Sequence, residues 1–137
     1  MGKSSSRGRL LIVDDDYSIC TMLAEKLSGE GYECDSCAEG EPALDLMQRH
    51  AYDAIVLDLM MPGISGLEIL MTARKAHPQA AFIIVTGIDD MKLAEQALKQ
   101  GADAYLVKPI QLEKLVVSVA REIETKRRQG AAPPAQD

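Results

Sequence analysis

The sequence predicts an α/β fold in which one parallel sheet carries helices on both faces. Along the 137-residue chain, apolar residues recur alternately at a spacing of about 2 and of about 3.6, which is typical of strands followed by helices. Five such strand–helix units follow one another with short connections. This alternation favours a single doubly wound domain with right-handed crossovers.

The first two units lie in the N-terminal half of the chain. Residues 10–13 form a continuous apolar run, as expected of a strand that is buried on both faces. The helix that follows ends at Gly31, and a shorter strand over 33–36 comes next. Pro42 suits the first turn of the second helix. We expect the inward faces of these helices to consist of Ile19, Met22, Leu23, Leu27, Leu44, Met47 and Ala51.

The third unit begins with an apolar strand over 54–57. Pro62 and Gly63 mark a turn after this strand. Ser65 and Glu68 then form a capping-box pattern, which predicts the start of a helix that is bounded by Pro78. We expect its inward face to contain Leu67, Leu70, Met71 and the stem of Arg74.

The last two units follow the same order. A strand over 81–85 precedes a helix that Asp89 or Asp90 caps and Gly101 ends. The final strand covers 104–107 and leads into a long amphipathic helix. The expected inward residues of these two helices are Met91, Ala94, Leu98, Leu112, Leu115, Val116, Val119 and Ile123.

Charge and composition argue against several classes of protein. The net charge of −6 argues against direct contact with nucleic acid, because phosphate binding needs clustered Lys and Arg side chains. No apolar stretch approaches the roughly 18 residues of a membrane span. The first nine residues lack the apolar core of a secretion signal. We therefore expect a cytoplasmic protein.

The three cysteines indicate packing positions. Cys34 and Cys37 form a C-x-x-C pattern, but they lie on a predicted strand, where residues three apart point to opposite faces and are ~10 Å apart. That separation is too large for a disulfide. We interpret both residues, and Cys20, as small and partly buried packing side chains.

Composition also suggests the domain boundaries. We expect residues 1–8 to be a disordered N-terminal segment, residues 9–125 to form the domain, and residues 126–137, which contain a Pro-Ala tail, to be a tail or linker. The charged stretch from Arg121 to Arg128 is interpreted as the solvated end of the last helix rather than a binding arm.

Polar side chains follow four of the predicted strands at the point where each strand ends. They are Asp14, Asp15, Asp16, Asp58, Thr86 and Lys108. Because the carboxyl ends of parallel strands meet at one edge of a sheet, these side chains are expected to lie together where ligands bind in open α/β sheets.

The chemistry of this group points to phosphate and a divalent metal. Two carboxylates ~4 Å apart repel each other by roughly 4 kcal/mol at an effective dielectric near 20. Three carboxylates therefore need raised pKa values or a cation, and hard oxygen ligands suit Mg²⁺. A nucleophilic carboxylate, a metal, a Lys and a hydroxyl are what phosphoryl transfer onto an aspartate requires.

These residues resemble the receiver domain of two-component response regulators, and the resemblance covers about residues 9–124. It implies a flavodoxin-like (βα)5 fold with a five-stranded parallel sheet in the order 2-1-3-4-5. The matching motifs are Leu11-Ile12-Val13-Asp14-Asp15-Asp16, Asp58-Leu59-Met60-Met61-Pro62-Gly63-Ile64-Ser65-Gly66, Val85-Thr86-Gly87, Gly101-Ala102-Asp103-Ala104-Tyr105 and Lys108-Pro109.

The resemblance implies a role for each matching residue. Asp58 would accept a phosphoryl group from a phosphohistidine of a sensor histidine kinase or phosphotransfer protein. The Mg²⁺ ligands would be Asp14, Asp15, Asp58 and the backbone carbonyl of Met60, whereas Asp16 would start a helix. Lys108, with a cis peptide bond to Pro109, would pair with the phosphoryl group.

A conformational switch is also implied. Thr86 would move to bond the phosphoryl oxygen, and Tyr105 occupies the switch position of the family. Phosphorylation would then bias a two-state surface made by the fourth helix, the fifth strand and the fifth helix. Met60 and Ile88 are large and apolar at positions that flank the phosphoryl group in such domains, which predicts slow self-dephosphorylation.

Two other classes of function are considered beside this one. A Mg²⁺-dependent aspartyl phosphatase is the main alternative, although Met60 supplies no general acid two residues after the nucleophile. A nucleotide-binding flavodoxin-like domain would need a Gly-rich loop after the first strand, where the aspartates stand. In the leading interpretation the protein is not an enzyme, and its only chemistry is phosphoryl transfer onto itself and self-dephosphorylation. The partners expected for such a protein are an output domain or effector protein, and a second copy of the chain in a phosphorylation-dependent homodimer.

Overall fold

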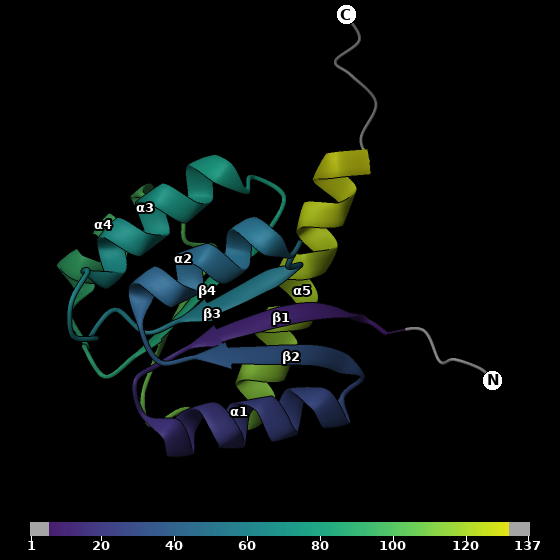
Figure 1. Ribbon diagram of the computed structural model, residues 1–137, viewed down its shortest axis with the longest axis horizontal. Helices are drawn as coiled ribbons and strands as arrows, with labels where there is room; N and C mark the ends of the chain where they lie inside the picture. The colour runs from purple at the N-terminus through teal and green to yellow at the C-terminus, as the bar shows by residue number, and fades with distance from the viewer. Residues whose placement is uncertain (1–5, 132–137) are drawn as a thin grey trace, which may run out of the picture.

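Five parallel strands form one sheet in the order β2-β1-β3-β4-β5 (Figure 1). The computed structural model describes residues 6–131. The strands are β1 (Gly8–Val13), β2 (Tyr32–Cys37), β3 (Ala54–Leu57), β4 (Ala81–Thr86) and β5 (Ala104–Val107). The helices are α1 (Tyr17–Gly29), α2 (Gly40–Arg49), α3 (Gly66–Ala76), α4 (Met91–Lys99) and α5 (Leu112–Ala131). The expected (βα)5 fold and strand order are confirmed.

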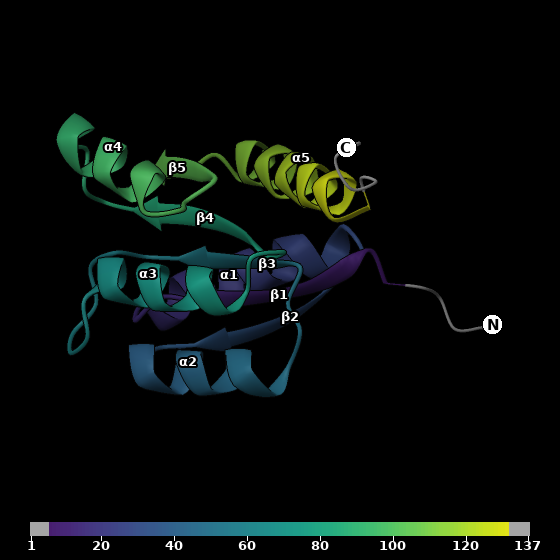
Figure 2. The ribbon, with the colours of Figure 1, turned by 90° about the horizontal axis from the view of Figure 1, so that it is seen from above.

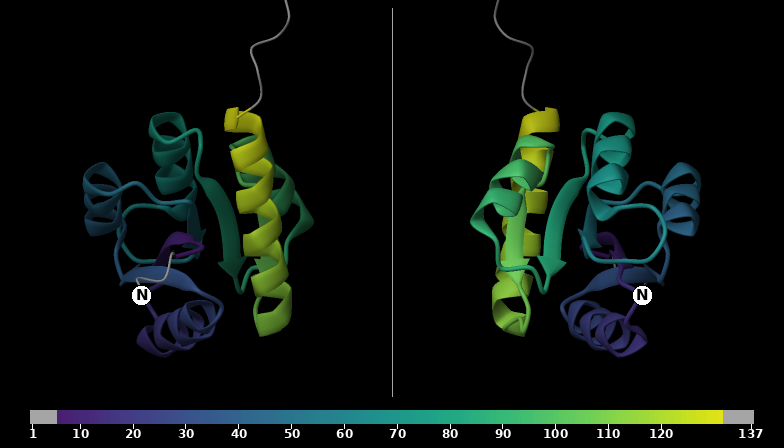
Figure 3. Two further views of the ribbon diagram at one scale, coloured as in Figure 1. Left: turned by 90° about the vertical axis from the view of Figure 1, so that its right-hand side faces the viewer. Right: turned by 90° about the vertical axis from the view of Figure 1, so that its left-hand side faces the viewer.

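Helices cover both faces of the sheet. Viewed along the strands, α2 and α3 lie on one side and α1 lies on the other (Figure 3). One apolar cluster joins the sheet to α2, α3 and α4, and a second joins it to α1 and α5. The central strands β1, β3 and β4 are almost wholly buried, as their continuous apolar sequences predict.

The strand register brings the predicted site residues to one edge. Val13 of β1 pairs with Leu57 of β3, so that Asp14 and Asp58 leave the sheet side by side. Thr86 pairs with Val107, and the Lys108 N–H donates to the Thr86 carbonyl at 2.8 Å. The peptide bond from Lys108 to Pro109 is cis, as the resemblance implies.

Helix caps follow the sequence signals. Asp16 caps α1 by accepting the N–H groups of Ser18 and Ile19, and Ser65 caps α3 by accepting from Glu68. Of the two candidates for the start of α4, Asp90 is the cap, because its carboxylate accepts from Lys92 and Leu93.

Several residues that were predicted to face inward are exposed in the structure. The exposed residues on helices are Met22 (38%), Met71 (42%), Met91 (77%) and Leu98 (48%). Ala51 is also exposed, and it lies beyond the end of α2 at Arg49. On α4 the buried face belongs instead to Ala97 and the partly buried Leu93, which are four residues apart, as Ala94 and Leu98 are. Spacing alone did not separate these two neighbouring faces of a short helix.

The first strand and the last helix each extend slightly past the predicted limits of the domain. β1 begins at Gly8, and the Arg7 N–H donates to the Gly31 carbonyl at 2.9 Å. α5 continues to Ala131, beyond residue 126 where a tail was expected. The remaining parts of the predicted N-terminal segment and tail, residues 1–5 and 132–137, lie outside the described residues. Between residues 6 and 131, no helix has the length and apolar character needed to span a bilayer.

Candidate functional site

Lys108 joins the two buried carboxylates at the carboxyl edge of the sheet. Its Nζ lies 2.7 Å from Asp14 Oδ2 and 2.9 Å from Asp58 Oδ2. Asp14 and Asp58 are 3% and 5% exposed, so both charges are largely removed from water. The expected meeting of groups from β1, β3 and β5 is therefore confirmed.

Three further contacts, from β2, the loop after β1 and α1, hold Asp14. The Asp14 N–H donates to the Cys37 carbonyl at 3.1 Å, and the Asp16 N–H donates to Asp14 Oδ1 at 2.9 Å. The buried thiol of Cys20 donates to the Asp14 carbonyl at 3.1 Å. Burial raises the pKa of this thiol, which keeps it protonated as a donor.

Asp58 is held at its backbone and at one carboxylate oxygen. Its N–H donates to the Val13 carbonyl at 3.0 Å, which continues the β1–β3 pairing one residue past the strands. The Met60 N–H donates to Asp58 Oδ1 at 3.0 Å. These contacts, with Lys108 on the other oxygen, fix the orientation of the carboxylate.

Burial and pairing act in opposite directions on the charges of the site. Burial raises the pKa of Asp14 above its usual value, and hydrogen bonds from Lys108 and Asp16 only partly offset this. Burial alone would lower the pKa of Lys108, but its hydrogen bonds to Asp14 and Asp58 outweigh burial and raise it. Lys108 therefore stays a cation at neutral pH.

The carboxylates of Asp14, Asp15 and Asp58 form a group suited to a hard cation. One oxygen from each lies within 4.8 Å of the others, and Asp15 is exposed whereas the other two are buried. Such a set, open to solvent on one side, is typical of Mg²⁺ sites that keep several waters. The residues present therefore fit the expected metal.

Thr86 and Tyr105 lie on β4 and β5 beside this group. Thr86 is fully buried, and its Oγ1 makes no hydrogen bond within the described chain. A buried hydroxyl without a hydrogen-bond partner is energetically costly, which makes this oxygen atom unusual in the described chain. The half-buried Tyr105 donates its OH to the Ile88 carbonyl at 2.8 Å, which ties β5 to the loop before α4.

Met60 and Ile88 have different surroundings. The Met60 side chain is 59% exposed beside the carboxylates, in a hollow of about 430 Å³ that also includes Asp15 and Ser65. Ile88 is partly buried against the apolar cluster under α2, α3 and α4. Both side chains are apolar, as the sequence requires.

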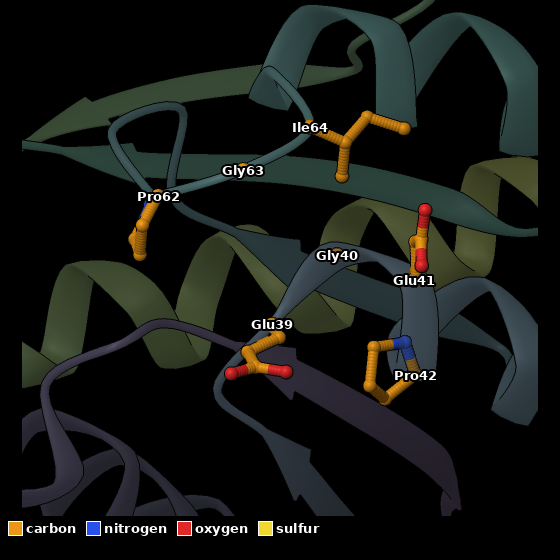
Figure 4. A pocket seen from close by; sticks show the side chains of 7 residues that line it. All are labelled: Glu39, Gly40, Glu41, Pro42, Pro62, Gly63 and Ile64. Carbon is orange, nitrogen blue, oxygen red and sulfur yellow. The ribbon is translucent and has the colours of Figure 1, made fainter.

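A second hollow lies next to the site between the start of α2 and the loop after β3 (Figure 4). It measures about 360 Å³ and is lined by Glu39, Gly40, Glu41, Pro42, Pro62, Gly63 and Ile64. The two glutamates carry the same charge as phosphate, so this hollow does not suit a phosphoryl group. The strand-end group is the better candidate site.

Two contributors to the site were missed by sequence reasoning. Cys20 was interpreted only as a packing residue, yet its thiol holds the Asp14 carbonyl. A Cβ on Gly66 would lie 2.4 Å from Leu59 Cα, so only glycine lets α3 start against the loop after Asp58. The spacing of Cys20 six residues after Asp14, on the first turn of a helix, was the available signal for the first contact.

Comparisons with known proteins agree with this geometry. The family model described as "Response regulator receiver domain" matches residues 10–120. The chain is 38% identical over 117 residues to "DNA-binding transcriptional regulator NtrC" of Klebsiella pneumoniae, covering 85% of this chain and 25% of that protein. It is 38% identical over 108 residues to "Response regulator MprA" of Mycobacterium sp. (strain KMS), covering 79% and 47%. The chain thus spans less than half the length of these curated relatives.

Solved structures are similar over nearly the whole chain. A CheY-like response regulator receiver domain protein from Methanospirillum hungatei JF-1 superposes with a TM-score of 0.87 at 30% identity, covering 92% of this chain and 100% of that one. The "BeF3 Activated DrrB Receiver Domain" gives 0.80 at 31%, covering 85% and 97%. Because the family model spans most of the sequence, the chain belongs to the response regulator receiver domains, which are signalling modules of two-component systems.

Proposed function

We propose that this protein is a phosphorylation switch in which Asp58 accepts a phosphoryl group from a phosphohistidine on a sensor histidine kinase or phosphotransfer protein. The observation that carries the proposal is the contact of one cation, Lys108, with the two buried carboxylates of Asp14 and Asp58. Receiver domains generally bind Mg²⁺ at an acidic cluster, and this chain has one.

In the proposed reaction, a carboxylate oxygen of Asp58 attacks the phosphorus atom and the phosphorus–nitrogen bond of the phosphohistidine breaks. The electron pair of that bond returns to the imidazole. Asp14, Asp15, Asp58 and the Met60 carbonyl would hold Mg²⁺, which when bound neutralises charge on the transferred oxygens. Lys108 can leave its carboxylate partners to pair with a phosphoryl oxygen, and it remains charged because its pKa is raised.

The proposed switch uses the unpaired hydroxyl of Thr86. Donation from Thr86 Oγ1 to a phosphoryl oxygen would satisfy a buried group that has no partner in the described chain. The resulting shift acts on Tyr105, whose OH holds the Ile88 carbonyl just before α4. We infer that these two states differ on the surface of α4, β5 and α5.

That surface has the features of a docking site for the output. Met91, Leu98 and Val117 expose 77%, 48% and 56% of their area on α4 and α5. A mostly apolar hollow of about 390 Å³ between β5 and α5 is lined by Leu106, Glu113, Lys114, Val117, Ser118 and Arg121. The proposed partners are an output domain, an effector protein, or a second phosphorylated copy of this chain. We place the protein in the cytoplasm.

The aspartyl phosphatase alternative is not favoured. Receiver domains are signalling switches, and the residue two positions after Asp58 is Met60, which cannot act as a general acid.

Thermal unfolding with beryllofluoride, a phosphoryl mimic, tests the proposed site. Mg²⁺ and beryllofluoride together should raise the Tm, because a ligand of the folded state stabilises it, whereas either one alone should not produce the full rise. Asp58→Asn should abolish the combined effect, and size-exclusion chromatography of the same samples reports any dimer. An equal rise in Tm for Asp58→Asn would contradict Asp58 as the acceptor.

A further inference from the structure

The apolar stripe of α5 ends in a buried lysine. Val119 and Ile123 pack against the sheet, and Lys126 follows on the same face of the helix. The Lys126 side chain is 9% exposed, and its Nζ lies 3.1 Å from Asp103 Oδ1. A lysine buried to this degree needs such a partner, because an unpaired charge at this depth is strongly disfavoured.

Asp103 connects α5 to three other elements. Its Oδ2 accepts the Phe82 N–H of β4 at 2.8 Å, and its own N–H donates to the Phe82 carbonyl at 2.7 Å. Arg74 of α3 approaches the same oxygen at 4.0 Å. Asp103 directly precedes β5, the strand that carries Tyr105. The carboxylate therefore fixes the starting ends of β4 and β5 to α3 and α5.

A neighbouring pair fastens the end of α5 to the start of β1. Arg127 Nη2 lies 3.5 Å from Asp53 Oδ1 and donates to the Arg7 carbonyl at 2.9 Å. Figure 2 shows the end of α5 at the side of the molecule where β1 begins. The outward side chains Glu124 and Arg128 are 62% and 72% exposed, so the last turns of α5 have one buried face and one charged face.

β4 and β5 link this contact to the phosphorylation site. They are paired from Ile83 and Ala104 through to Thr86 and Val107, and the pairing continues from the Lys108 N–H to the Thr86 carbonyl. Asp103 stands at one end of these two strands, and Thr86 and Lys108 stand at the other. A pull on Thr86 and Lys108 toward a phosphoryl group is directed away from Lys126.

We propose that Lys126 and Asp103 form a clasp that holds the last turns of α5 closed on the sheet, and that occupation of the phosphorylation site loosens this clasp. The proposal rests on the function proposed above and adds a second output at the opposite edge of the sheet, separate from the α4–β5–α5 surface. A small displacement of β5 toward the site lengthens the ion pair between Asp103 and Lys126, whose side chain is only 9% exposed and so has little access to solvent. By linkage, opening the clasp must in turn favour occupation of the site.

Hydrogen exchange of the backbone amides tests this proposal on the full chain. Three proteins are compared, each with and without Mg²⁺ and beryllofluoride: the unsubstituted chain, Lys126→Met and Arg128→Met. Methionine keeps the length of the lysine stem and removes the charge, and Arg128 provides a matched charge removal on the exposed face. Asp103→Asn keeps an oxygen that can accept the Phe82 N–H while it weakens the ion pair, and it should behave as Lys126→Met does.

Exchange over residues 124–131 should be several-fold faster in Lys126→Met than in the unsubstituted chain and unchanged in Arg128→Met. Beryllofluoride with Mg²⁺ should speed this exchange in the unsubstituted chain and in Arg128→Met. In Lys126→Met, where exchange is already fast, adding the two should cause no further increase. Amides at residues 86–90 report occupation of the site. If they respond while residues 124–131 exchange at the same rate or more slowly, the clasp proposal is overturned and the proposed function stands. If neither region responds, the proposed function fails and the coupling fails with it.

Discussion

Lys108 is the residue on which the charge balance of the site depends. Its ammonium lies against two buried carboxylates, Asp14 and Asp58, and these hydrogen bonds raise the pKa of Lys108 and keep it charged. A buried group of this kind contributes little to stability in return for its desolvation. In the proposed mechanism its role is functional, because the same ammonium would pair with a phosphoryl oxygen once a metal occupies the carboxylates.

The lifetime of the phosphoryl group is predicted at the residue scale. Met60 is exposed beside Asp58, and Ile88 follows Thr86 by two residues; neither offers a polar group to orient an attacking water. We expect Met60→Asn with Ile88→Glu to lose its phosphate several-fold faster than the unsubstituted chain. The rate of phosphate loss is measured after the phosphoryl donor is removed. Equal rates for the double variant and the unsubstituted chain would contradict the prediction.

At the scale of elements, Gly66 sets how closely α3 approaches the loop after β3. An added Cβ would lie 2.4 Å from Leu59 Cα and 2.8 Å from the Leu59 carbonyl oxygen, and backbone atoms cannot move aside cheaply. We expect Gly66→Ala to lower the free energy of unfolding by about 1–3 kcal/mol. It should also weaken beryllofluoride binding, because Leu59 and Met60 follow Asp58 directly.

The matched control for this change is Gly29→Ala in α1. A Cβ there has no heavy atom within 4 Å among its described surroundings, so alanine should leave stability unchanged or raise it by up to about 1 kcal/mol. Urea unfolding of both variants compares them. A Gly66→Ala protein as stable as Gly29→Ala would show that the close approach is not needed.

Tyr52 links the chain just before β3 to β2, and this link depends on pH. Its OH donates to Asp35 Oδ2 at 2.6 Å, and burial together with this hydrogen bond raises the pKa of the phenol well above its usual value of 10.0. Above about pH 10 the unfolded chain loses this proton while the folded chain keeps it. The stabilisation is therefore present below that pH and lost as the pH rises further.

Tyr52→Phe should lower the free energy of unfolding at neutral pH by about 1.5–3 kcal/mol, the range for a hydrogen bond to a charged group. Its stability should fall less steeply than that of the unsubstituted chain above pH 10. Urea unfolding across this range measures both effects, with Tyr17→Phe as the control because Tyr17 is 83% exposed. Parallel pH profiles for Tyr52→Phe and the unsubstituted chain would refute the role of the phenol.

At the scale of the whole molecule, the sequence predicts the fold and the meeting of the site residues because both follow from local patterns. Continuous apolar runs identify the central strands, and a polar residue directly after each run must lie at the carboxyl edge. The Cys20 contact and the Lys126–Asp103 pair could not be predicted in this way. The Cys20 thiol contacts a backbone carbonyl, for which its spacing from Asp14 is the one local signal. Lys126 and Asp103 are 23 positions apart, where spacing carries no signal.

The exposed methionines illustrate the opposite error. Met91 and Leu98 fit a helical period, but α4 instead buries Ala97 and partly buries Leu93. Periodicity shows that a helix has an apolar side without showing which side the sheet covers. Large apolar side chains left on the surface are consistent with a protein whose α4 face is used by a partner.

Uptake of a phosphoryl group from acetyl phosphate, followed by intact mass, tests the central claim most directly. The account predicts the added mass of one phosphoryl group on the unsubstituted chain, dependent on Mg²⁺. It predicts the same for the control Asp89→Asn, whose exposed carboxylate is not one of the Asp14, Asp15 and Asp58 group. Asp58→Asn should take up none. Phosphoryl uptake by Asp58→Asn at the level of the unsubstituted chain, or no uptake by the unsubstituted chain with Mg²⁺ present, would contradict it.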